Sequence, residues 1–149
     1  MELFGYTVEV DETAARDWYA GFEGWDCDCG HCRNFLRLAR ERKLPPVAME
    51  VLDRLGIPPE KATYVCELYE KDGLLVYQAS WRVAGRILRE PEREDFSCEK
   101  DCGSCGHEVY PYGAPGFPQP HFDLMFFLGL PWVLDEPMDG PSEPEGDPV

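Results

Sequence analysis

The sequence predicts an α+β fold, in which two helices from the N-terminal half pack on one face of a mainly antiparallel sheet of about four to five strands. Two neighbouring stretches, 32–44 and 46–55, have the spacing of apolar residues that a helix requires. The next two stretches, 62–70 and 74–88, have strand character and flank a short turn, as in a β-hairpin. Helices do not alternate with strands, so a parallel sheet is not expected.

Each predicted helix has one apolar face and a clear end. In the first helix the face repeats at positions i, i+3, i+4 and i+7, occupied by Cys32, Phe35, Leu36 and Ala39. Pro45 and Pro46 end this helix, and Pro46 suits the first turn of the next one. The second face consists of Ala48, Val51, Leu52 and Leu55. Gly56 follows it as the expected C-cap.

The strands are predicted from alternation and from turn residues. Residues 3–10 and 121–127 read as the first and last strands, and Lys71-Asp72-Gly73 is the turn of the central hairpin. Gly85 is expected to mark a bulge or bend in the long second strand of that hairpin. Residues 11–26 and 110–120 are expected to be loops, because neither segment has a clean period.

Length and charge limit the classes of function. A chain of 149 residues has the size of one domain, predicted for 1–137, followed by an acidic, proline-rich tail at 138–149 that we expect to be disordered. No apolar run reaches the ~20 residues of a membrane span, and no leader pattern is found, so we expect a cytoplasmic protein without a membrane partner. The net charge of −15 argues against nucleic acid as a partner and leaves a protein partner open.

One part of the chain departs from this acidic character. Five of the fourteen basic residues fall within eleven positions of the first predicted helix: Arg33, Arg37, Arg40, Arg42 and Lys43. A solvated helix face explains such a run, and a surface that meets an anionic partner is the alternative.

Seven cysteines in a reducing compartment favour metal or redox chemistry over a framework of disulfides. They include two clusters, Cys27/Cys29/Cys32 and Cys98/Cys102/Cys105. Each cluster contains a C-x-x-C pair, and two such pairs supply the four thiolates of a closed zinc site. The predicted zinc ligands are Cys29, Cys32, Cys102 and Cys105. Possible replacements for one of them are Cys27, Cys98, His31, His107 and His121.

The spacing of the two clusters leaves other interpretations open. Sixty-nine residues separate Cys32 from Cys102, far more than the ~15–20 of a compact zinc finger. Gly103 and Gly106 resemble the glycines of a zinc-knuckle turn. Cys29-Gly30-His31-Cys32 is also a redox dithiol motif, with Cys29 as nucleophile and Cys32 as resolving thiol. The third interpretation is that Cys32 only packs on the apolar helix face.

No phosphate loop, H-E-x-x-H or G-x-S-x-G motif is present, so enzymatic activity has no other support.

Several motifs together resemble a widespread set of small bacterial proteins of uncharacterised function. The motifs are C-x-x-C-x-N-F, L-G-I-x-P-x-K, V-x-G-x-I and a closing P-x-x-x-L-x-F-x-x-x-x-P-W. In this sequence they occupy Cys29, Cys32, Asn34 and Phe35; Leu55, Gly56, Ile57, Pro59 and Lys61; Val83, Gly85 and Ile87; and Pro120, Leu124, Phe126, Pro131 and Trp132.

The resemblance covers most of residues 25–136 and implies a single domain without an established activity. It also implies that the second cysteine cluster is a local addition. We therefore expect a non-catalytic binding or interaction protein with a zinc site. The alternatives are a thiol–disulfide oxidoreductase and, by analogy with other small acidic bacterial proteins, an immunity-type inhibitor of a basic toxin.

Overall fold

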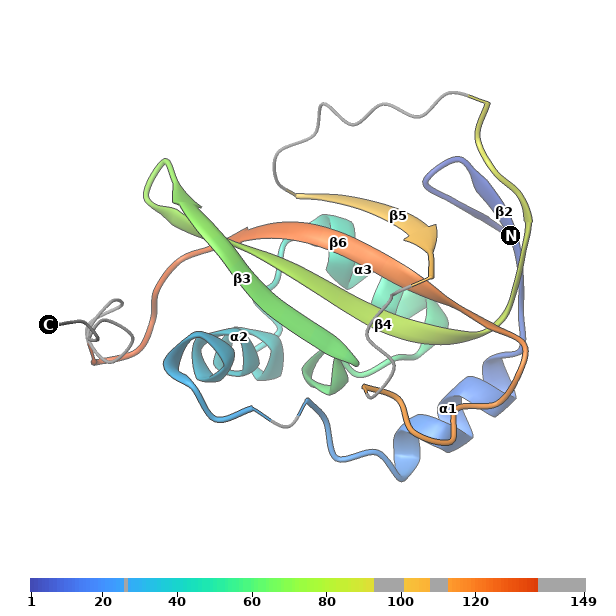
Figure 1. Ribbon diagram of the computed structural model, residues 1–149, viewed down its shortest axis with the longest axis horizontal. Coiled ribbons are helices and arrows are strands. Elements are labelled where there is room, and N and C mark those ends of the chain that lie inside the picture. The colour runs from blue at the N-terminus through green and yellow to red at the C-terminus, as the bar shows by residue number, and fades with distance from the viewer. Residues whose placement is uncertain (26, 93–100, 108–112, 137–149) are drawn as a thin grey trace, which may run out of the picture.

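The computed structural model describes residues 1–25, 27–92, 101–107 and 113–136 of the chain. In these residues the helices are α1 (Glu12–Ala20), α2 (Gly30–Arg40), α3 (Pro46–Leu55) and the short 3-10 helix η1 (Pro59–Lys61). The strands are β1 (Glu2–Leu3), β2 (Tyr6–Val10), β3 (Tyr64–Lys71), β4 (Leu74–Arg89), β5 (Cys102–Gly106) and β6 (His121–Leu130). The strands form one antiparallel six-stranded sheet, and the α-helices precede its main hairpin, which confirms the predicted α+β fold (Figure 1).

The long strand β4 organises the sheet because it pairs with three other strands. Its first part lies between β3 and β6, and its last part pairs with β2. The resulting order is β1-β2-β4-β6-β5, with β3 also beside β4 (Figure 1). The β3–β4 hairpin closes through Asp72 and Gly73, which both have positive φ (56° and 81°), as a tight two-residue hairpin turn requires.

Alternate side chains of β4 and β6 form the sheet's contribution to the core. They are Tyr77, Ala79, Trp81, Val83, Phe122, Leu124, Phe126 and Leu128, and all are buried. From α2, the Phe35 ring contacts the rings of Tyr77 and Trp81, with centroids 5.5 and 6.1 Å apart. The apolar face predicted for α3 joins the same core cluster. The helical and strand periodicities in the sequence therefore correctly predicted which faces of the helices and of the sheet pack together in the core.

The segment expected to be a loop at 11–26 contains the helix α1, so that expectation was wrong. The Asp11 side chain caps this helix by accepting a hydrogen bond from the Ala14 N–H at 3.1 Å. Gly21 follows as the C-cap. Only Ala15 and Tyr19 are buried, one turn apart. An apolar stripe of two residues is too narrow to give a clear helical period.

The two other differences concern turns and glycines. Residues 3–10 form two strands and not one, because Phe4 and Gly5 take positive φ (55° and 85°) and reverse the chain. Gly103 lies inside strand β5, so the expected zinc-knuckle turn is absent from that position. A Cβ there would come within 2.6 Å of the Phe4 ring and 2.7 Å of the Phe126 ring, so this glycine is needed for close packing.

Two other sequence expectations concern membrane-spanning helices and residues that the structure does not describe. Among the described residues, no helix combines the length and the apolar character needed to cross a bilayer. The tail expected at 138–149 and the cysteine at position 98 lie outside the described residues.

Candidate metal centre

Three cysteines at the start of α2 bring their sulfur atoms together. The Sγ atoms of Cys27, Cys29 and Cys32 all lie within 4.8 Å of one another. Cys32 is buried (5% exposed), Cys27 is half-buried and Cys29 is exposed. In the described part of the chain this is the one group of three or more metal-ligating side chains that lie this close. The group can hold a metal ion, and one of its sides is open to solvent.

The backbone at the helix start positions these sulfur atoms. Cys29 is the N-cap of α2, and its Sγ accepts a hydrogen bond from the Cys32 N–H at 3.4 Å. The Cys29 backbone in turn hydrogen-bonds the Cys27 side chain. Amide donors and the positive end of the helix dipole both stabilise negative charge on thiolates at this point. The C-x-C-x-x-C spacing therefore puts Cys27 and Cys29 at a helix start where backbone groups hydrogen-bond their sulfur atoms.

The three thiols do not share one electrostatic environment. The hydrogen bond from the Cys29 backbone lowers the pKa of Cys27, although burial and the nearby carboxylate of Glu67 act in the opposite direction. Burial raises the pKa of Cys32, and its hydrogen bonds with Cys27 and Cys29 raise it further. A metal ion would therefore have to displace a firmly held proton from Cys32, which makes metal binding dependent on pH.

The segment after β6 lies over the same helix end. The Arg33 guanidinium forms a two-point ion pair with Glu136, at 2.7 and 3.0 Å, and its Nε donates to the backbone oxygen of Asp28 at 3.2 Å. Gly30 permits this approach, because a Cβ there would lie 2.9 Å from Glu136 Oε2. The loop that carries Cys27 and the segment around Glu136 are thus both fixed to Arg33.

His31, between the two cysteines of the C-x-x-C pair, is turned toward other partners. Its Nδ1 lies 3.8 Å from Glu67 Oε2, and its ring packs edge-on against Trp132. The Tyr77 hydroxyl donates to the His31 backbone oxygen at 2.6 Å, which ties the first turn of α2 to β4. His31 does not join the three sulfur atoms as a fourth ligand in this structure.

The structure does not assemble the expected four-thiolate site of Cys29, Cys32, Cys102 and Cys105. Cys102 and Cys105 lie on β5, where Cys102 is disulfide-bonded. Cys105 is buried, its Sγ lies 4.0 Å from the backbone oxygen of Leu3, and burial raises its pKa to about 12. The pairing of β5 with β6 holds both residues away from the sulfur group at α2.

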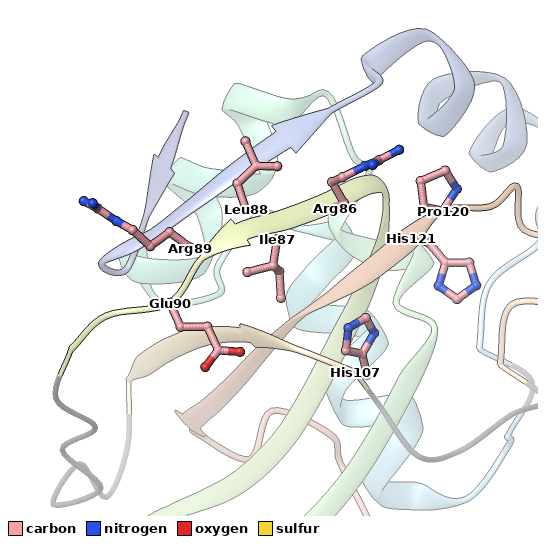
Figure 2. A pocket seen from close by; sticks show the side chains of 8 residues that line it. All are labelled: Arg86, Ile87, Leu88, Arg89, Glu90, His107, Pro120 and His121. Atoms are coloured by element: carbon pink, nitrogen blue, oxygen red, sulfur yellow. The ribbon is translucent and has the colours of Figure 1, made fainter.

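The other two histidines line a hollow at the end of β4. His107 and His121 lie near each other there, together with Ile87 and Glu90 (Figure 2). Burial and the positive charge of Arg82 lower the pKa of His121. Both are separate from the sulfur group, so neither replaces a cysteine ligand.

The predicted ligand set named Cys27 only as a possible replacement, although the C-x-C-x-x-C spacing directly before a helical period groups it with Cys29 and Cys32. The surrounding fold also differs from that of a thioredoxin-like redox site. There the dithiol follows a strand of a βαβ unit, whereas all strand pairs described here are antiparallel and α2 follows α1.

No model of a protein family matches this chain, and searches of curated proteins and of solved structures find no match to it. The functional interpretation therefore depends on the geometry of the cysteine group.

Proposed function

We propose that this protein is a non-catalytic metal-binding protein that holds one zinc ion through Cys27, Cys29 and Cys32. The observation that carries the proposal is the mutual proximity of the three sulfur atoms, all within 4.8 Å. Three thiolates around one ion, each at a Zn–S distance of about 2.3 Å, place their sulfur atoms within such a separation. The backbone hydrogen bond to Cys27, which lowers the pKa of that thiol, further supports a thiolate ligand at this position.

The donor set favours a soft or borderline metal. Thiolates select zinc, copper(I) or iron–sulfur clusters, whereas magnesium and calcium prefer oxygen ligands. Zinc binds four ligands in tetrahedral geometry, so three protein thiolates leave one position for another ligand. The exposed side chain of Cys29 places this open side of the group toward solvent.

The position of the ligands also indicates what the ion would do for the fold. All three lie within the six residues 27–32, so a bound ion closes only a short local loop. A structural zinc site that holds a fold together links segments far apart in the chain, as the expected four-cysteine site would have done. We therefore expect zinc to order the loop before α2 and to leave the core of Phe35, Tyr77 and Trp81 unchanged.

Metal analysis tests the proposal directly. Protein purified without chelators after expression with ample zinc should carry close to one zinc per chain. Cys27→Ser and Cys29→Ser should each lower that content markedly. Cys66→Ser is the matched control, because Cys66 lies on β3 outside the sulfur group and its loss should leave the metal content unchanged. Less than one-tenth of an equivalent in the wild-type protein, or copper in place of zinc, would contradict the proposal.

A second candidate, thiol–disulfide exchange, is favoured by one specific observation. Cys29 is exposed at the helix N-cap while Cys32 is buried beside it, the arrangement of an attacking and a resolving thiol. This candidate predicts turnover in an assay that follows reduction of a disulfide by the protein. Activity that is equal in the wild type and in Cys29→Ser would eliminate it. Full disulfide-reducing activity in zinc-loaded protein would argue against the metal proposal instead, because a Cys29 thiolate bound to zinc is not free to attack a disulfide.

A further inference from the structure

Arg33, near the start of α2, links two segments that lie far apart in the sequence. Its Nε donates to the backbone oxygen of Asp28, the residue between Cys27 and Cys29, at 3.2 Å. Its two terminal nitrogens donate to the carboxylate oxygens of Glu136 at 2.7 and 3.0 Å. One rigid, planar guanidinium makes all three contacts. The position of the loop that carries the first two cysteines therefore depends on where Glu136 holds Arg33.

The same guanidinium interacts with the negative charge of the cysteine group. Hydrogen bonding to Glu136 is the main cause that raises the pKa of Arg33. The charges of Asp28 and of a Cys29 thiolate raise it further. A zinc ion bound by three thiolates keeps a net negative charge, and a fixed cation near Cys29 offsets part of that charge.

The closing segment, residues 131–136, is docked on α2 by a further contact and runs from the end of β6 to the side of this helix (Figure 1). The Val133 N–H donates to Asn34 Oδ1 at 2.8 Å. The Trp132 Nε1 donates to the backbone oxygen of Glu136 at 2.7 Å, so the segment folds back on itself. Docking of the closing segment therefore places the Glu136 carboxylate opposite the guanidinium.

From these contacts we infer that Arg33 is a positioning residue that couples zinc binding at the cysteine group to docking of the closing segment on α2. The inference rests on the proposed zinc site. With the segment docked, Arg33 holds the cysteine loop in place, so less conformational freedom is lost when the ion binds. Coupling between two equilibria is reciprocal, so zinc stabilises the docked segment by the same factor by which docking raises the affinity for zinc.

The zinc affinity of the full-length protein, measured by competition with a chromophoric chelator, tests the first half of the inference. Glu136→Gln should weaken zinc binding about tenfold, because Arg33 loses the group that holds it. Asp53→Asn is the matched control: it also removes one negative charge from an arginine pair, with Arg42, but this pair includes neither the cysteine loop nor the closing segment. The control should change the affinity by less than about twofold. Equal losses in the two variants would overturn the inference, because they would show an effect of net charge alone.

Arg33→Lys separates the position of the guanidinium from its charge. Lysine keeps the charge but lacks the planar fork that contacts Glu136 and Asp28 together. Zinc binding should again weaken about tenfold. The charge-transfer absorption of the cobalt(II)-saturated variant should match that of the wild type, because all three thiolates still bind the metal. Wild-type zinc affinity in Arg33→Lys would overturn the inference.

Hydrogen exchange followed by mass spectrometry measures the reciprocal effect. Zinc should slow the exchange of the amides of residues 132–136 about tenfold in the wild type and less than about twofold in Glu136→Gln. A purely structural role of the Arg33–Glu136 pair would stabilise the segment equally with and without zinc. Equal exchange rates in zinc-loaded and zinc-free wild-type protein would therefore overturn the inference.

The failures of the two proposals can be told apart. If the wild-type protein binds no zinc, the zinc site itself is wrong and the inference falls with it. If the wild type and Glu136→Gln bind zinc with the same affinity, the zinc site stands and only the coupling through Arg33 is overturned.

Discussion

The side chain of Asn34, in α2, is hydrogen-bonded to the backbone of Val133, a residue 99 positions later in the chain. Asn34 Oδ1 accepts from the Val133 N–H at 2.8 Å, and Nδ2 donates to the backbone oxygen of Pro131 at 3.1 Å. Asn34 is fully buried, so one amide side chain replaces water for two backbone groups of the segment that follows β6. This segment carries Glu136, which pairs with Arg33 at the start of α2.

Asn34→Ala should therefore lower the free energy of unfolding by about 1–3 kcal/mol, because it removes the side-chain partner of two part-buried backbone groups, the Pro131 carbonyl and the Val133 N–H. Urea denaturation followed by tryptophan fluorescence measures this change. Glu50→Ala, at an exposed position of α3, is the control and should change the free energy by no more than about 0.5 kcal/mol. A similar small effect for both variants would show that Asn34 does not fix the segment.

The second prediction is a large loss of stability when Gly85, in β4, is replaced by a residue with a side chain. Its φ of 141° is unfavourable for other residues, and a Cβ there would collide with the backbone carbonyl oxygen of Glu9 on β2. Gly85→Ala should lower the free energy of unfolding by about 2–4 kcal/mol, since both strands must shift. Gly73→Ala is the matched control: its φ is 81°, but a Cβ there meets nothing within 4 Å, so the cost should be only about 1 kcal/mol. Equal losses in thermal or urea denaturation would contradict this steric explanation.

The fold was largely predictable because its main elements carry strong periodic signals. The alternation around Tyr77, Ala79 and Trp81 and the helical spacing of α3 each identify a buried face without any other information. Helix α1 was missed because it buries only Ala15 and Tyr19, and a capping aspartate alone does not predict a helix. β5 was missed because two of its five residues are glycines, which weakens any strand signal.

The candidate site was predicted only in part, and for a different reason. Ligand spacing along the chain locates sulfur atoms that share a local turn, and it identified Cys29 and Cys32. It cannot decide whether Cys102 and Cys105, about 70 residues further on, reach the same place. That depends on strand order, and the pairing of β5 with β6 became known only from the structure.

A buried ion pair between β4 and β6 gives the third prediction. Arg82 and Asp123 meet through two hydrogen bonds of 3.0 and 3.2 Å, and their side chains are only 12% and 1% exposed. Arg82→Ala should cost about 3–5 kcal/mol in the free energy of unfolding, because the Asp123 carboxylate stays buried without the guanidinium. The double variant Arg82→Met/Asp123→Leu should cost clearly less. If its cost equals or exceeds that of the single variant in urea denaturation, burial of the charge is not the cause.

The fourth prediction concerns pH and His121. Burial and the charge of Arg82 lower the pKa of His121 below its usual 6.5, with a smaller contribution from His107 and partial opposition from Asp123. At pH values between the pKa of His121 in the folded chain and its pKa in the unfolded chain, the unfolded chain therefore binds more protons at this histidine than the folded chain does. The contribution of His121 to stability is complete above pH 6.5 and is lost as the pH falls through the folded pKa.

NMR titration of the imidazole signals should show a pKa for His121 below 6.5, and His121→Gln supplies both the assignment and the stability control. The free energy of unfolding of the wild type should fall between about pH 7.5 and pH 5 more steeply than that of His121→Gln, because glutamine does not titrate in this range. His107→Gln should remove only part of the shift, since Arg82 and burial remain. A His121 pKa at or above 6.5, or parallel pH profiles for the two proteins, would show that the hollow at the end of β4 does not hold this imidazole neutral.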